Sequence, residues 1–93
     1  MEAEEINGVL WECLAKTGTS LSSQELARKT GMSLADTQVG LARLKQAQLI
    51  NGIGASPYQA YQAVLKFDAL RWAKAVGLGI DLLSLESHAS LSA

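Results

Sequence analysis

The chain has 93 residues, of which 48% are hydrophobic and 18% are charged, a balance typical of a single folded domain and not of a disordered segment. Its net charge of −1 and pI of about 5.7 exclude the overall basic character that many nucleic-acid-binding proteins have. No apolar run approaches the roughly 20 residues needed to span a bilayer, and the acidic start MEAEE argues against a secretory signal. A single cysteine, Cys13, allows no internal disulfide and suits the reducing cytoplasm.

A first helix is expected from about Ala3 to Lys16. Apolar residues recur at helical spacing and predict a core-facing stripe: Ile6, Val9, Leu10, Cys13 and Leu14. Trp11 falls off this stripe, and we interpret it as facing a partner or a C-terminal segment. The loop composition at 17–20 ends the helix.

Residues 21–50 predict two helices separated by a tight turn. Ser22 is a candidate N-cap, and Glu25, three residues later, completes a capping-box pattern. Gly31 stands where the end of a helix favours a residue that tolerates positive φ. The second helix opens in the same way, with Ser33 as its cap. The charged residues of 21–50 are four basic and two acidic, which gives this segment a local charge of +2, whereas residues 1–12 hold four acids and no base.

The second of these helices is expected over 33–47. Its inward residues are Thr37, Leu41 and Leu44, with Gly40 on the same side allowing close approach of another backbone. Two helices joined by a short turn that contains glycine form a helix-turn-helix.

The run Met32-Ser33 to Leu41-Ala42-Arg43-Leu44 to Ala47-Gln48-Leu49-Ile50 resembles the recognition helix of bacterial winged helix-turn-helix regulators of the MarR and ArsR type. The resemblance extends over roughly residues 6–66. It implies a mainly α fold with a small β-hairpin: about four helices plus a two- or three-stranded wing sheet.

Two short strands are expected on either side of a Gly/Ser/Pro-containing turn at 51–59, in the position of the wing. The second strand falls within 60–66. No Lys or Arg lies between Lys45 and Lys66, so a contact of the wing with DNA would rely on polar side chains such as Gln59, Gln62 or Asn51.

A further helix is expected from Phe67 to Val76, ended by the glycines at 77 and 79. It is apolar on nearly all sides, which predicts two packing partners: the core and a second subunit. The residues assigned to dimerisation are Trp11, Phe67, Leu70, Trp72, Val76, Ile80, Leu82 and Leu83. The predicted organisation is a winged-helix core at 1–66, a C-terminal helical segment at 67–86 that packs on the core and dimerises, and a frayed tail at 87–93.

Catalysis is not expected. The chain has one cysteine, one histidine (His88) and no glycine-rich phosphate loop, so a nucleophile, a base and an orienting group cannot be assembled. We also expect no cofactor and no metal site, because His88 has no second His or Cys cluster to share a metal.

The favoured function is that of a DNA-binding transcriptional regulator, acting as a homodimer with helix 33–47 in the major groove. The predicted DNA contacts are Ser22, Ser23, Lys29, Ser33, Gln38, Arg43, Lys45 and Gln59. Among them, Gln38 suits adenine, and Arg43 suits guanine or phosphate. The alternative is a winged-helix module for protein–protein interaction, an adaptor or inhibitor subunit that does not bind DNA. The acidic pI and the uncharged wing favour that alternative.

Overall fold

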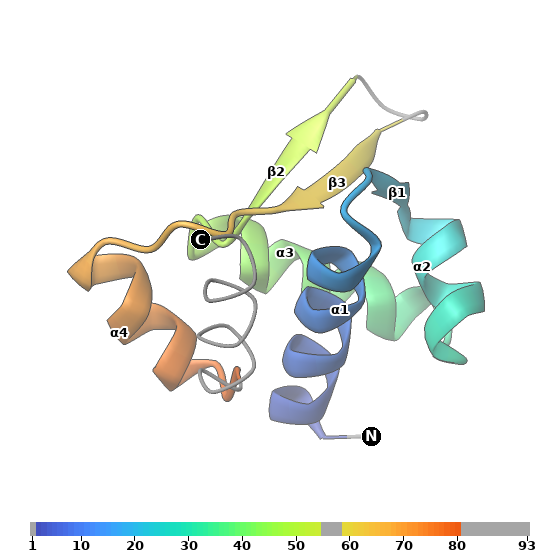
Figure 1. Ribbon diagram of the computed structural model, residues 1–93. Helices are drawn as coiled ribbons and strands as arrows, with labels where there is room; N and C mark the ends of the chain where they lie inside the picture. Colours follow the sequence, from blue (N-terminus) through green and yellow to red (C-terminus); the bar gives the residue numbers. More distant parts are fainter. Residues whose placement is uncertain (1, 55–58, 81–93) are drawn as a thin grey trace.

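A computed structural model describes residues 2–54 and 59–80 of the chain. The elements are α1 (Ala3–Thr17), β1 (Leu21–Ser22), α2 (Ser23–Thr30), α3 (Leu34–Gln46), β2 (Ile50–Ile53), β3 (Ala60–Ala63) and α4 (Ala69–Gly77) (Figure 1). The described part is therefore mainly helical with a small antiparallel sheet of three strands, as predicted. Among these residues, no helix is both long enough and apolar enough to cross a membrane.

Both predicted caps at the start of α2 and α3 are present. The Ser22 hydroxyl accepts the Glu25 N–H at 3.2 Å, and Glu25 Oε1 accepts the Ser22 N–H at 3.1 Å, which completes the capping box. Ser33 Oγ likewise accepts the N–H of Asp36 at 3.1 Å. Gly31 ends α2 with a φ of 74°, the left-handed conformation that glycine adopts without steric cost. These local signals explain why α2 and α3 begin and end where the sequence predicts.

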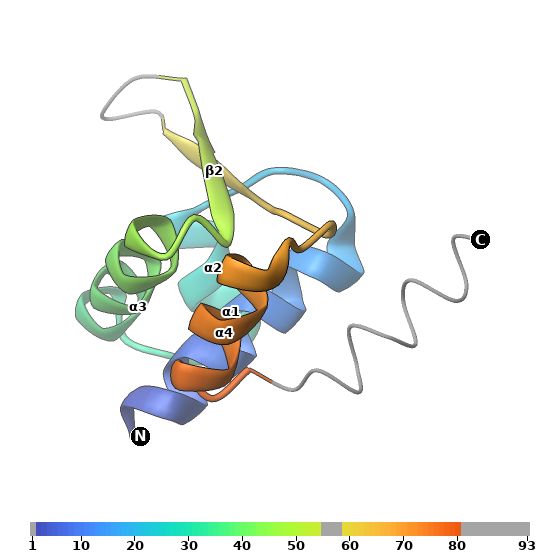
Figure 2. The same cartoon turned by 90° about the vertical axis from the view of Figure 1, so that its left-hand side faces the viewer.

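The sheet has the strand order β1-β3-β2, with both neighbours of β3 antiparallel to it. Leu21 pairs with Tyr61, and Ile50 pairs with Ala63. The short strand β1 therefore ties the start of α2 to β3. Figures 1 and 2 show that β2 and β3 extend as a ribbon beyond the layer of helices.

The core lies where α1, α2 and α3 meet. Its fully buried large side chains are Leu10, Trp11, Leu14, Leu26, Thr37, Leu44 and Leu49. At Gly40, α3 lies so close to α1 that an added Cβ would overlap the Leu10 side chain and stand 2.7 Å from Ile6 Cγ2. The predicted close approach at Gly40 is therefore confirmed. Val9, predicted to be in the core, is instead 37% exposed, because α1 packs with Trp11 and not Val9 inward.

Trp11 is the main correction to the predicted burial pattern. Its side chain is 1% exposed, so it has no free surface to offer a second subunit. Its ring lies 5.9 Å from the ring of Phe67 in an edge-on arrangement, and Phe67 makes a similar contact with Trp72 at 6.2 Å. Trp11 therefore packs against the segment that leads into α4, the second of the two interpretations of its position.

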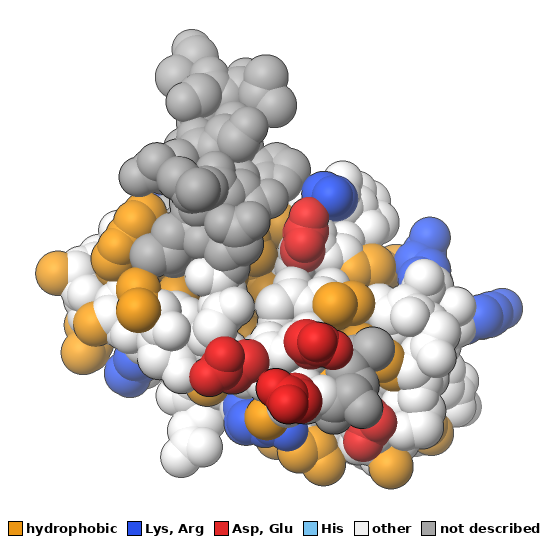
Figure 3. All heavy atoms as spheres, turned by 90° about the horizontal axis from the view of Figure 1, so that it is seen from below, with side chains coloured by type: hydrophobic (Ala, Val, Ile, Leu, Met, Phe, Trp, Pro, Cys, Tyr) orange, Lys and Arg blue, Asp and Glu red, His pale blue; other side chains and the backbone are white. Residues whose placement is uncertain are grey.

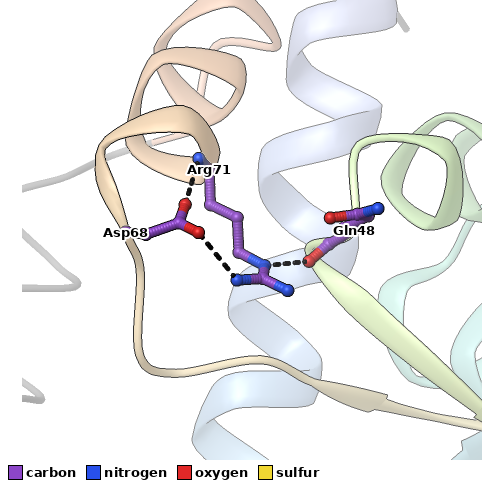
Figure 4. Close-up of polar contacts among 3 residues, drawn as sticks. All are labelled: Gln48, Asp68 and Arg71. Carbon is purple, nitrogen blue, oxygen red and sulfur yellow. Dashed lines mark hydrogen bonds and ion pairs between the residues drawn. The ribbon is translucent and has the colours of Figure 1, made fainter.

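Two side-chain hydrogen bonds connect α4 and the residue that follows it to the rest of the fold. The Arg71 guanidinium donates to the backbone oxygen of Gln48 at 3.1 Å and also pairs with Asp68, whose carboxylate caps α4 (Figure 4). Asn7 of α1 donates to the backbone oxygen of Leu78 at 3.2 Å. The predicted dimerisation residues Leu82 and Leu83, together with His88 and the 87–93 tail, lie outside the described residues.

Candidate functional site

A polar hollow of about 290 Å³ lies between the start of α2, the first half of α3 and the start of β3. Its lining residues are Ser22, Ser23, Gln24, Leu34, Gln38, Gln59 and Tyr61, which we call the α2–α3–β3 surface. Four of the eight predicted DNA contacts meet there: Ser22, Ser23, Gln38 and Gln59. They come from three separate parts of the chain.

The pairing of β1 with β3 explains how the two ends of this surface come together. Because Leu21 lies opposite Tyr61, the first residues of α2 stand beside the Tyr61 side chain. The Tyr61 hydroxyl is 3.2 Å from Gln59 Oε1 and donates a hydrogen bond to it. This bond restrains the Gln59 carboxamide, so less side-chain entropy is lost when that amide binds a ligand.

Helix α3 supplies the opposite wall. Leu34 and Gln38 are one turn apart and therefore share one side of the helix, and both are exposed. The other side of α3 packs against the core through Thr37 and Leu41. Packing of α3 on the core thus fixes the direction in which Gln38 points.

Lys45 adjoins the surface next to β2. A Cβ at Gly52 would overlap the Gln59 carboxamide and would stand 3.5 Å from Lys45 Nζ. The absence of a side chain at Gly52 therefore leaves room for an amide and an ammonium group over the same stretch of β2. Lys45 is the predicted cationic contact that the structure places nearest to the hollow.

The α2–α3–β3 surface itself is uncharged. It presents three carboxamides, two serine hydroxyls, one phenol and the methyl groups of Leu34. The nearest acid in the sequence, Glu25, is held in the capping box, where the hydrogen bond from the Ser22 backbone N–H lowers its pKa. Because Ser22 Oγ accepts a bond there, its own O–H hydrogen stays available to a ligand.

The other three predicted DNA contacts lie elsewhere. Lys29 is in the last turn of α2, at the opposite end of that helix from Ser22 and Ser23. Ser33 is exposed, and its oxygen caps α3. Arg43 turns toward α1, where its guanidinium donates to the Ala3 backbone oxygen at 3.3 Å and to Asn7 Oδ1 at 3.2 Å. Arg43 is therefore not part of the α2–α3–β3 surface.

The acidic side chains of α1 gather at another end of the molecule. Figure 3, viewed from below, shows them clustered where α1 begins, and Figure 1 shows that the β2–β3 ribbon extends on the opposite side. Glu4, Glu5 and Glu12 border a hollow there together with Gly79 and Ile80. The negative charge of residues 1–12 is thus separated from the α2–α3–β3 surface.

A second surface of interest is the outer face of α4, which carries only apolar or small residues. Its members are Ala69, Leu70, Ala73, Val76 and Gly77, all of them exposed. Leu70 is 61% exposed and Val76 is 56% exposed, whereas Ala75 on the inner side is fully buried. The charged residues Arg71 and Lys74 lie toward α3, next to Gln48 and Ala47.

The six predicted dimerisation residues that the structure describes fall into three groups. Leu70 and Val76 are open to solvent, and Phe67 and Trp72 are half-buried against each other. Trp11 and Ile80 are buried, at 1% and 5% exposure, and are removed from the interface that the sequence predicts.

Three residues of the α2–α3–β3 surface were not predicted: Gln24, Leu34 and Tyr61. Gln24 directly follows the predicted contacts Ser22 and Ser23 at the start of α2, so the sequence could have predicted that it belongs to the same surface. Leu34 reads as a core residue from composition, and Tyr61 reaches the surface only through a strand pairing across 40 positions. Their roles depend on tertiary structure.

No protein-family model matches this chain, and neither a curated protein nor a solved structure is significantly similar to it. Within residues 2–54 and 59–80, no three His, Cys, Asp or Glu side chains are placed to hold a metal ion.

Proposed function

We propose that the chain is a winged helix-turn-helix domain that binds double-stranded DNA and regulates transcription as a homodimer. In this proposal α2 and α3 form the helix-turn-helix, α3 enters the major groove and the β2–β3 ribbon is the wing. The observation that carries it is the convergence of Ser22, Ser23, Gln38 and Gln59 on one hollow, with Lys45 beside it. The acidic end of α1 lies away from that hollow, which limits its repulsion of phosphate.

The backbone of DNA would be held by groups at the edge of the surface. The first N–H groups of α2 and the free O–H hydrogens of Ser22 and Ser23 are suitable donors to phosphate oxygens. Lys45 supplies a positive charge on the side of the wing. In this proposal Gln38 and Gln59 contact base edges.

Two observations support the proposed dimer: the small number of cationic contacts and the outer face of α4. With Arg43 turned toward α1, a monomer offers few cationic contacts, and such an interaction weakens steeply with salt. Two copies double these contacts and fix the distance between half-sites. The outer face of α4 has no charge to oppose self-pairing, and its small residues Ala69, Ala73 and Gly77 permit close approach of a second helix.

The test is binding to random-sequence duplex DNA across a salt series, with the molar mass measured by light scattering. We expect a dimer whose log affinity falls linearly with log salt concentration. Lys45→Ala should reduce that slope by about 1 for each phosphate that is no longer neutralised, hence by about 2 per dimer. Lys74→Ala, next to α3 but away from the hollow, is the matched control and should leave the slope unchanged. The absence of binding at about 50 mM salt would contradict the proposal, because phosphate binding is strongest at low salt.

A second candidate is a protein-interaction module that does not bind DNA. It is favoured by the exposed apolar face of α4 and by the lack of Lys or Arg in β2 and β3. This candidate predicts a monomer that has no affinity for DNA. It also predicts that Leu70→Glu changes only the binding of another protein.

A further inference from the structure

The α2–α3–β3 surface combines three carboxamides with one exposed leucine, Leu34, and it contains no charged side chain. We propose that this surface reads adenine–thymine base pairs in the major groove. The proposal rests on the proposed DNA-binding function and specifies which sequence class that function selects.

The donor and acceptor pattern of the bases explains the choice. The carboxamide of glutamine matches adenine, accepting from its N6 amino group and donating to N7, whereas guanine is matched by arginine or lysine and cytosine by a carboxylate. Gln24, Gln38 and Gln59 supply the first kind of group. The lining of the hollow contains neither of the other kinds: Arg43 is bound to Ala3 and Asn7, and Lys45, which adjoins the surface on the side of the wing, is assigned to phosphate.

Leu34 matches thymine, the partner of adenine. Thymine is distinguished in the major groove by its C5 methyl group, which apolar side chains contact. Leu34 and Gln38 are one helical turn apart, about 6 Å along α3. Base pairs are stacked about 3.4 Å apart, so this spacing spans about two successive steps. One side chain therefore meets a thymine methyl group while the other meets an adenine edge close by.

The same geometry distinguishes this readout from the commoner attraction of cations to the narrow minor groove of A·T tracts. That attraction requires Arg or Lys side chains inserted into the groove. Strands β2 and β3 carry neither residue type. The preference should therefore depend on adenine N7 and the thymine methyl group, which lie in the major groove.

The experiment compares short duplexes of one length at one low salt concentration. We expect an alternating A·T duplex to bind about 5- to 100-fold more tightly than an alternating G·C duplex, the discrimination of one or two bidentate contacts. Replacement of adenine by 7-deazaadenine removes the N7 acceptor and leaves the minor groove intact, so it should abolish most of that ratio. Replacement of thymine by uracil removes the methyl group and should cause a smaller loss.

Matched variants locate the effect on the protein. Gln38→Ala should reduce the A·T preference, whereas Gln46→Ala, an exposed glutamine on the same helix that borders a different hollow, should retain it. Just before β3, Gln59→Ala should act like Gln38→Ala. Gln62 was also a candidate for the wing, but it follows Tyr61 directly in β3 and so points to the opposite face of the sheet, which makes Gln62→Ala the control.

The outcomes separate this inference from the function on which it rests. Equal, salt-dependent affinity for A·T and G·C duplexes would overturn the readout and leave DNA binding intact. An A·T preference that survives both 7-deazaadenine and Gln38→Ala would also overturn it, since the readout would then lie elsewhere. Failure to bind any duplex would overturn both.

Discussion

Helices α3 and α4 are attached to the rest of the fold in opposite ways. Helix α3 turns its apolar residues inward, with Leu41 and Leu44 buried and Gly40 against the side chains of α1. Helix α4 turns Leu70 and Val76 outward and faces α3 with Arg71 and Lys74. Its contact with the core depends on Ala75, on the neighbouring aromatic rings and on a few hydrogen bonds.

The difference indicates what each helix contributes. Close packing leaves α3 no room to shift by even the width of a methyl group. A surface that presents Gln38 in a fixed direction would require such packing. Helix α4 is positioned by directional hydrogen bonds, and the apolar area it leaves in solvent is stabilising only once a partner covers it. Under the proposed function, α3 would serve recognition and α4 would serve association.

The sharpest way to test this contrast is to add one methyl group to each helix. Gly40→Ala should destabilise the fold by about 1–3 kcal/mol, because the new Cβ would overlap side chains of the packed α1 interface. Gly77→Ala at the end of α4 meets nothing within 4 Å and should be neutral or stabilising by up to about 1 kcal/mol, since alanine favours helix. Urea denaturation followed by circular dichroism measures both. Equal losses would contradict the proposed difference.

A smaller effect is expected from loosening α4 alone. Arg71→Ala removes the bond to the Gln48 backbone oxygen and a largely exposed ion pair with Asp68, so we expect a loss of about 1 kcal/mol. Amide hydrogen exchange should show faster exchange in α4, with α1 and α3 unchanged. Asp68→Asn keeps a good N-cap and is the control, expected to leave exchange in α4 nearly as it is.

The smallest effect concerns pH and the start of α2. The folded state lowers the pKa of Glu25, so its capping bond contributes stability above the unfolded pKa, and this contribution is lost as the pH falls through the lower, folded value. Glu25→Gln keeps a capping-box acceptor but does not titrate. The difference in melting temperature between the two proteins should therefore stay constant near neutral pH and change below about pH 4.3, because only the original chain loses this contribution. A constant difference in melting temperature down to about pH 3, a full unit below that value, would show that the bond contributes nothing.

Short-range chemistry made much of this architecture predictable. The caps at Ser22 and Ser33 and the turn at Gly31 involve residues within three or four positions of one another, and all three are confirmed. Ser22, Ser23, Gln38 and Gln59 were grouped as predicted DNA contacts through the resemblance of the sequence to a family and not through such local signals. Nothing local to the sequence specifies which of several apolar faces a helix buries.

That ambiguity accounts for what the sequence did not predict. Trp11 and Val9 both lie on α1 within one turn, and Trp11 is buried in contact with Phe67, which is distant in the sequence. Arg43 lies at the border of the exposed side of α3, and the acceptor oxygens that draw it toward α1 are about 40 positions away in the chain.

Asn7 carries the most specific requirement of any position in α1. Its side chain is 2% exposed, and its carboxamide accepts from Arg43 of α3 while donating to the Leu78 backbone oxygen after α4. Aspartate has the same shape but would set a carboxylate oxygen against a carbonyl oxygen, and leucine has the same size but would satisfy neither partner. The neighbouring core positions constrain the volume and shape of an apolar side chain, whereas position 7 also distinguishes between atoms of nearly equal size. A sequence redesigned for this backbone could exchange apolar side chains of matching shape in the core of α1 but would have to retain asparagine at position 7.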